Sequence, residues 1–251
     1  MNFMGTVPVD IVWGGKLPSH GDFLWSGNRV AIRMLLEEWL QMGMLQGRSQ
    51  YGDNWGDQLA HAPIWNMLLP SRVVGGEKIV VGCLAPSVDR VGRRYPFFVG
   101  YAFPESVVLA SAAVLIELPT LMNAVGHQIY TAIQRSWPRS SLDGIWDQVL
   151  ENWMAEFSIQ GPQSGNQPTT SSEILDVLGH MSSIEMEAQN TRPVLRGASY
   201  PWPDIGRALL ERERTSFWWT HPAGGASLKA FSYDAGLDGP LMTWLFGRSG
   251  R

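Results

Sequence analysis

The residues most suggestive of chemistry lie in one short stretch, KLPSHGDFLW, at residues 16–25. Ser19, His20 and Asp22 are the side-chain types that serve as a nucleophile, a general base and the acid that orients the base. Neighbouring residues of an extended chain point to opposite faces, so these side chains are too close in sequence to form a triad among themselves. A catalytic site here needs partners from elsewhere in the chain.

A second polar stretch, PSVDRVGRRYP at residues 86–96, contains candidate partners. Ser87 and Asp89 could approach His20 across the fold, so a hydrolase-like composite site of His20, Ser87 and Asp89 is one hypothesis. No GxSxG nucleophile elbow occurs in the sequence, and nothing in it fixes a general base.

The same stretches also have a structural interpretation as ordered loops. Pro18 fixes its backbone φ, Gly21 permits a left-handed turn, and the Asp22 carboxylate can accept backbone N–H bonds. In the second stretch, Asp89 and Arg90 can form a buried or loop-bracing ion pair. Ordered loops commonly carry function. We therefore predict two motif loops that hold the fold or bind a partner, with contributions from Lys16, Pro18, His20, Gly21, Asp22, Ser87, Asp89, Arg90, Gly92 and Arg93.

The remaining residue patterns predict neither a metal site nor a cofactor. The five histidines are scattered, and neither an HExxH motif nor a cysteine pair occurs. The glycine pairs do not open a GxGxxG or GxxxxGK loop and are more typical of turns. We expect no bound metal and no cofactor.

Charge and hydropathy indicate a soluble cytoplasmic protein. The net charge of −4 provides no electrostatic footprint for nucleic acid. The most apolar segment, residues 107–122, is interrupted by Glu117 and Pro119 and is shorter than the ~20 residues a spanning helix needs. The N-terminus lacks the pattern of a signal peptide, and the single Cys83 lies in an apolar run typical of a buried thiol. We expect neither membrane insertion nor nucleic-acid binding.

The first half of the chain predicts alternating strands and helices. Asn28 is suited to cap a helix that runs to about Gln46, and a shorter helix is expected before Pro63. Gly75 and Gly76 predict a hairpin connection between two of the expected strands. The strand-like runs cover residues 7–15, 64–70, 78–86 and 93–103.

In the second half, residues 105–135 predict a helical stretch interrupted or kinked near Pro119. Ser141 is a plausible cap for a helix over residues 141–157, and Asp204 for a short helix that follows it. The segments expected besides these are a flexible loop or linker near 160–173, a helix near 173–181, strands in TSFWWTHP and SLKAFSY, and a last helix in GPLMTWLFG.

These patterns together predict an α/β fold. Continuous apolar strands indicate a sheet covered on both faces by helices. We expect a layered α/β/α sandwich with a mixed sheet, forming a single compact domain over residues 1–251.

Several sequence blocks resemble the TagF (ImpM) family of type VI secretion accessory proteins. The first blocks are GKLPSHGDF at 15–23, WLQMGM at 39–44 and APIW at 62–65. They are followed by PSVDRVGRRYP at 86–96, SFWWT at 216–220 and FGR near the end. The blocks occur in order over most of the chain, and the first and fourth together are specific.

The resemblance implies a non-enzymatic, cytoplasmic protein that post-translationally represses assembly of a type VI secretion system. It further implies action through a forkhead-associated scaffold protein, and a layered α/β fold. A structural subunit of the secretion apparatus is a further alternative. The oligomeric state is left open.

Two departures from the family pattern bear on these expectations. Val12, Trp13 and Gly14 stand where relatives tend to have a glycine followed by two aromatics, which affects packing of the first strand. The position of His20 is commonly arginine in relatives, and an arginine stays protonated and cannot replace a general base. The resemblance therefore disfavours catalysis by His20, and we predict that His20→Arg is tolerated whereas Asp22→Ala harms folding or partner binding.

Overall fold

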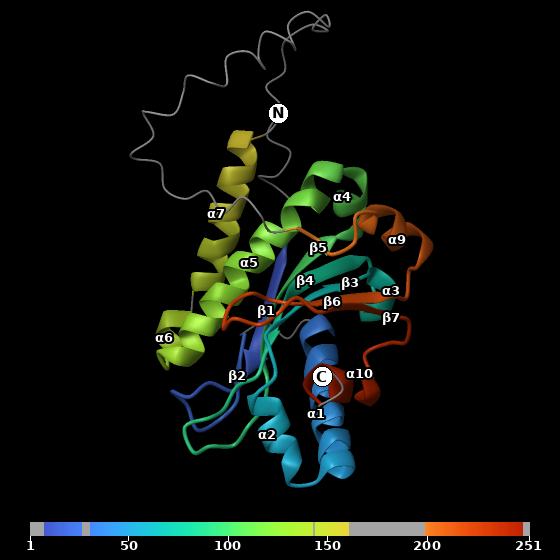
Figure 1. The fold of residues 1–251 in the computed structure, drawn as a ribbon. Helices are drawn as coiled ribbons and strands as arrows, with labels where there is room; N and C mark the ends of the chain where they lie inside the picture. Colours follow the sequence, from blue (N-terminus) through green and yellow to red (C-terminus); the bar gives the residue numbers. More distant parts are fainter. Residues whose placement is uncertain (1–7, 27–30, 143, 161–198, 248–251) are drawn as a thin grey trace, which may run out of the picture.

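A computed structural model describes residues 8–26, 31–142, 144–160 and 199–247 of the chain. Within these ranges the chain forms one seven-stranded sheet with helices on both faces (Figure 1). The order of strands across the sheet is β2-β1-β5-β4-β3-β6-β7. The strands are β1 (Asp10–Gly15), β2 (Leu24–Trp25), β3 (Trp65–Leu69), β4 (Lys78–Ala85), β5 (Phe97–Pro104), β6 (Ser216–Thr220) and β7 (Ala230–Tyr233).

The helices form two layers, one on each face of the sheet (Figure 1). One layer contains α4 (Glu105–Ala110), α5 (Ala112–Gln134), α6 (Arg139–Leu142) and α7 (Ile145–Gln160). The opposite layer contains α1 (Ala31–Tyr51), α2 (Asn54–Ala60) and α10 (Gly239–Phe246). Two shorter helices, α3 (Ser71–Val74) and α9 (Ile205–Glu211), lie at one end of the sheet.

Each face of the sheet has its own hydrophobic core. On the α5 side, Leu118, Leu121, Val125 and Ile129 recur at helical spacing and are fully buried against the sheet. On the α1 side, Trp218 is fully buried and its ring centroid lies 5.8 Å from that of Trp39. Central strands such as β4 contribute to both cores, which explains why their sequences are apolar at consecutive positions.

The predicted layered α/β fold with a single compact domain is confirmed, but the sheet is not mixed. All strand pairs between described residues are antiparallel. The connection between β3 and β4 spans only residues 70–77 and contains the one-turn α3. Gly75, with a φ of 73°, ends that helix in the left-handed conformation. Such a short connection returns the chain beside itself, and a parallel neighbour needs a crossover of a dozen or more residues.

Two expected helix boundaries and one expected capping bond differ from the structure. The helical stretch over 105–135 is interrupted at Ser111, whose hydroxyl caps α5 by accepting a bond from the Val114 N–H, and Pro119 lies inside α5. Ser141 belongs to α6 and does not cap α7. Asp204 stands at the N-cap position of α9, but its side chain makes no capping hydrogen bond.

The remaining expected elements are either seen or fall outside the described residues. The strands β6 and β7 and the helix α10 occupy the three predicted C-terminal segments. The expected cap Asn28, the loop near 160–173 and the helix near 173–181 lie outside the described residues.

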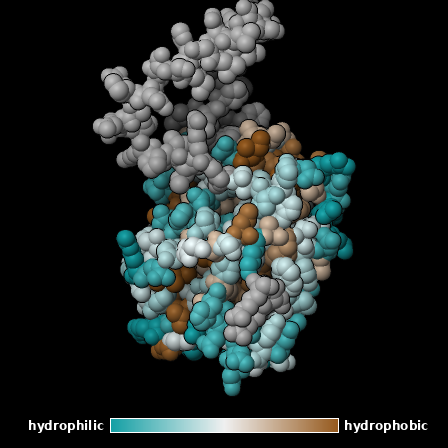
Figure 2. All heavy atoms as spheres, in the orientation of Figure 1, coloured by the Kyte–Doolittle hydropathy of each residue, from teal (hydrophilic) through white to brown (hydrophobic). Residues whose placement is uncertain are grey.

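The described surface and helices bear on membrane association. Across the described ranges, no helix is both long enough and apolar enough to span a bilayer. Figure 2 shows apolar side chains on this face as separate patches among hydrophilic ones. The exposed large hydrophobic residues include Met42 on α1, Trp244 on α10, Ile116 on α5 and Leu210 on α9.

Candidate functional site

The two motif loops leave the same end of the sheet because of strand register. Gly15, the last residue of β1, and Ala85, the last residue of β4, both pair with Phe97 at the start of β5. Lys16 therefore enters the first loop directly beside the second loop, which contains Asp89. The Lys16 Nζ lies 2.8 Å from the Asp89 Oδ2, and both side chains are almost completely buried.

The Asp89 carboxylate organises both loops. Its Oδ1 accepts hydrogen bonds from the backbone N–H groups of Val91 at 3.0 Å and Arg93 at 2.8 Å. Its Oδ2 accepts bonds from Lys16 and from the Arg93 Nε at 2.7 Å. Burial alone would raise the pKa of Asp89, but the bonds from Lys16 and Arg93 and the positive charge of Lys16 hold that pKa well below its ordinary range. Asp89 is therefore a permanently ionised acceptor at neutral pH.

Backbone contacts join the two loops further. The Arg90 N–H donates to the His20 carbonyl at 2.9 Å, and the Arg93 guanidinium donates to the Gly21 carbonyl. Gly92 has a φ of 90°, a left-handed conformation that favours glycine at the tip of the second loop. We call the set Lys16, Asp89 and Arg93, with the backbone groups they bind, the Asp89 junction.

The Asp89 junction differs from the expected loop chemistry in three residues. Gly21 does not have a positive φ; Gly15 and Gly92 do. Asp22 is exposed, and among the described residues no hydrogen bond or ion pair engages its carboxylate. Arg90 is exposed and does not pair with Asp89, because Lys16 and Arg93 occupy that carboxylate. The expected acceptor of backbone N–H bonds is thus Asp89, in the other loop.

Ser19 and His20 are hydrogen-bonded, but with the polarity opposite to that of a catalytic pair. The Ser19 hydroxyl donates its one proton to the Trp137 carbonyl at 2.6 Å. Its 2.8 Å bond with the His20 Nδ1 must therefore be donated by the imidazole N–H. A general base has to accept the serine proton, so this arrangement braces the loop against the segment after α5.

The structure does not assemble the composite hydrolase site either. Asp89 is engaged by Lys16 and Arg93, and His20 by Ser19. The buried Ser87 Oγ has no hydrogen-bond partner among the described residues. No hydrogen bond between described residues links the side chains of His20, Ser87 and Asp89. Likewise, within the described ranges no group of three or more His, Cys, Asp or Glu side chains could hold a metal ion.

Both loops that the Asp89 junction holds carry exposed side chains. Phe23 is 43% exposed and lies between the Lys16 Nζ, 4.8 Å from its ring centroid, and the Tyr95 ring, with a centroid separation of 4.7 Å. Val91 is 66% exposed at the tip of the second loop, next to the exposed Arg90. We call Phe23, Arg90 and Val91 the loop face. It combines an aromatic ring, an aliphatic side chain and a cation on loops that the hydrogen bonds of the Asp89 junction hold in place.

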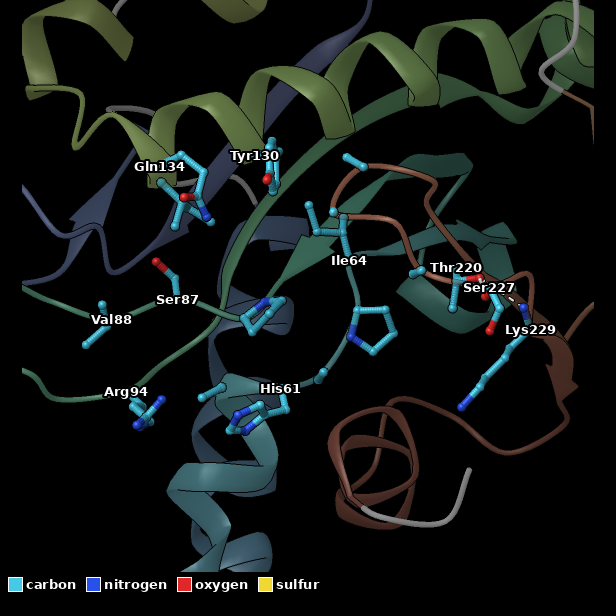
Figure 3. A pocket seen from close by; sticks show the side chains of 18 residues that line it. His61, Ile64, Ser87, Val88, Arg94, Tyr130, Gln134, Thr220, Ser227 and Lys229 are labelled. Carbon is cyan, nitrogen blue, oxygen red and sulfur yellow. Dashed lines mark hydrogen bonds between the residues drawn. The ribbon is translucent and has the colours of Figure 1, made fainter. Parts of the chain in front are cut away.

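A cavity of about 520 Å³ lies beside the second loop. Its walls come from the end of α2 and the start of β3, the Pro86–Val88 segment, the C-terminal end of α5, and the connection between β6 and β7 (Figure 3). Ser87 and Val88 line it from the second motif loop, and Gln134 lines it from α5. The cavity therefore combines segments far apart in the sequence.

A family described as "TagF N-terminal domain, Type VI secretion system-associated" matches residues 12–152, more than half of the chain. The chain belongs to this family. Both motif loops lie within the matched residues, as do the strands β2 to β5 and most of β1. The resemblance to TagF proteins is thus confirmed, and the protein is associated with type VI secretion.

A solved structure shares the fold of this chain. The crystal structure of PA0076 from Pseudomonas aeruginosa PAO1 matches with a TM-score of 0.51 and 19% sequence identity, over 96% of each chain. At this identity the likeness shows the shared fold alone. Among curated proteins, no sequence matches this chain.

Sequence reasoning missed several residues of this TagF-family site. Phe23 and Val91 carry the apolar part of the loop face, and the cavity draws on residues 220–229, which no motif had linked to the loops. Val91 had a detectable signal, because an isolated aliphatic residue in a polar loop is either buried or available to a partner. The cavity had none, because strand order alone brings β6 beside β3.

We expect His20→Arg and Asp22→Ala each to change the free energy of unfolding by less than about 0.5 kcal/mol. The Asp22 side chain is exposed, and the His20 side chain contributes one part-buried bond to Ser19. This expectation replaces the sequence-based one for Asp22. Urea denaturation followed by tryptophan fluorescence measures both. A loss of more than 1 kcal/mol of unfolding free energy in Asp22→Ala would show that Asp22 stabilises the loop.

Proposed function

We propose that the protein is a non-enzymatic cytoplasmic regulator that post-translationally represses type VI secretion assembly by binding a forkhead-associated scaffold protein. Membership of the TagF family supports the association with secretion. The loop face supports a binding role, and it is the observation on which the proposal depends. Its side chains project from backbone fixed by the Asp89 junction.

The residue types of the loop face suit protein recognition. Aromatic residues and arginine are enriched in interface cores, and a backbone ordered before binding lowers the entropic cost of association. Arg90 is positive in a chain of net charge −4, so we expect the contacted surface of the partner to be acidic.

The polarity of the Ser19–His20 pair also favours binding over catalysis. The Ser19 hydroxyl proton is committed to the Trp137 carbonyl, and the Asp89 carboxylate to Lys16 and Arg93. Neither group is then free to act as a nucleophile or a base. The ordered polar side chains of the two loops hold in place the backbone from which the loop face projects.

We expect the double variant R90E/V91D to lose at least tenfold of its affinity for the scaffold and to raise effector secretion in cells. The exposed side chains of both residues lie on the loop face, and the new carboxylates repel an acidic partner surface. The measurements are capture of the purified scaffold and effector release in a strain that carries only the variant.

The matched control is R207E/L210D on α9, where both side chains are also exposed. It makes the same charge and hydropathy changes away from the motif loops. Equal scaffold capture and equal secretion by the two double variants would contradict the proposal. Deletion of the gene is expected to raise secretion, and overexpression to silence it.

A further inference from the structure

The cavity beside the second motif loop contains a polar group that is buried but unsatisfied. The residue Ser87 is 8% exposed, and its Oγ has no hydrogen-bond partner among the described residues. A buried hydroxyl without a partner costs about 1–3 kcal/mol, so a ligand group that hydrogen-bonds to the Ser87 Oγ would recover that free energy. In Figure 3 the hydroxyl points toward Gln134, which lines the same end of the cavity.

The charge of the cavity walls specifies the ligand further. Arg94 and Lys229 line opposite sides of the cavity, and none of its lining residues is acidic (Figure 3). The Arg94 guanidinium lies 3.5 Å from the Asp57 carboxylate, which is 77% exposed. An exposed ion pair of this kind contributes only about 0–1 kcal/mol, so Arg94 can exchange it for a ligand anion at small cost.

The apolar part of the cavity suits a peptide more than an isolated ion. Pro63, Ile64 and Pro86 also line the cavity. Its volume of about 520 Å³ lies in the range of sites that enclose a few side chains rather than a single ion. A free anion would leave this apolar surface uncovered, whereas a peptide segment covers it.

We propose that this cavity binds an acidic peptide segment of a protein partner, with one carboxylate or phosphate at Arg94, a further acidic group facing Lys229, and a hydrogen bond to the Ser87 hydroxyl. The inference rests on the proposed function in one respect, namely that the partner is a protein. It deepens that function because Ser87, Val88 and Arg94 belong to the loop that also carries Val91 of the loop face.

The test is direct binding to the purified full-length protein by fluorescence anisotropy. The probes are fluorescein-labelled hexaglutamate, a labelled peptide with one phosphothreonine among glycines and alanines, and labelled hexaglutamine as the neutral isostere of the first. We expect saturable binding of at least one acidic peptide and at least tenfold weaker binding of hexaglutamine. The stronger of the two acidic probes identifies the anion as carboxylate or phosphate.

Two variants locate the binding in the cavity. R94Q/K229Q is expected to weaken binding of the acidic peptide at least tenfold, and Ser87→Ala about threefold, because each removes a predicted contact. The control R72Q/R207Q removes the same charge at the other end of the sheet, where both side chains are exposed. It is expected to leave binding unchanged.

Absence of saturable binding by either acidic peptide would overturn the inference. Equal weakening by R94Q/K229Q and R72Q/R207Q would also overturn it, since that result indicates non-specific attraction. Neither outcome touches the proposed repression, which the secretion assay of R90E/V91D tests separately. Conversely, cavity binding that persists when R90E/V91D leaves secretion unchanged would support the site and contradict the proposed function.

Discussion

Asp89→Ala is expected to lower the free energy of unfolding by about 3 kcal/mol or more, because removing one partner of a buried ion pair leaves the other charge uncompensated. The substitution leaves the Lys16 ammonium buried without its carboxylate and deprives the Val91 and Arg93 N–H groups of their acceptor. Urea denaturation at pH 7, followed by tryptophan fluorescence, measures the loss.

The double variant K16M/D89A separates the charge effect from the loop effect. Replacing Lys16 removes the buried charge, so the double variant is expected to lose less stability than the sum of the single changes. The loss of unfolding free energy that persists in the double variant measures the contribution of the backbone hydrogen bonds of the second loop. If the free energy of unfolding of Asp89→Ala lies within 0.5 kcal/mol of that of the unaltered protein, Asp89 does not organise the loops.

The second large effect is a loss of stability in mild acid caused by His221. This side chain is fully buried; its Nδ1 accepts a bond from the Ala223 N–H at 2.9 Å, so its Nε2–H donates to the Asn123 carbonyl at 3.1 Å. The neutral imidazole is thus satisfied at both nitrogens. Burial lowers the pKa of His221 from 6.5 to about 4, an effect reinforced by His127 and opposed by the bond to Asn123.

The sign of the effect follows from that depressed pKa. Between pH 6.5 and pH 4 the unfolded chain binds a proton at His221 that the folded chain does not, so protonation favours unfolding. The contribution of His221 is complete above about pH 6.5 and is lost as the pH falls toward 4, with a total of about 3 kcal/mol. Asp89 acts below this window, because its carboxyl is protonated only at lower pH.

The measurement is the slope of the unfolding free energy against pH from 7 to 4.5. His221→Gln is expected to flatten the slope, because it removes the titrating group. It is also expected to lower the free energy of unfolding at pH 7, because it perturbs the packing around residue 221. The control His61→Gln alters an exposed histidine and is expected to keep the slope. An unchanged slope in His221→Gln assigns the acid sensitivity to other groups.

Much of the fold was predictable because its signals are local. The apolar run of β4 and the spacing of Leu118, Leu121 and Val125 identify a doubly covered strand and a helix packed on it. The direction of strand pairing could not be predicted, because the antiparallel placement of β6 beside β3 depends on contacts between residues about 150 positions apart.

The site was predictable in its location but not in its internal roles. Both loops were identified from their Pro, Gly and Asp content, yet sequence could not assign the backbone-binding carboxylate to Asp89 rather than Asp22. Both are aspartates within loops of similar composition. Burial distinguishes them, and that burial follows from the register that sets Lys16 beside Asp89.

The C-terminal strands complete the sheet and α10 completes the α1 layer, which has a consequence for synthesis. Until residues 216–246 have left the ribosome, the edge of β3 has no partner, and the core position of Trp218 on the α1 side stays empty. The indole N–H groups of Trp39 and Trp65 likewise lack their acceptors, the carbonyls of Asp238 and Leu245, until that point. A nascent chain that has emerged only to residue 152 thus exposes a strand edge and apolar surface, the features by which chaperones and aggregating chains recognise incomplete proteins.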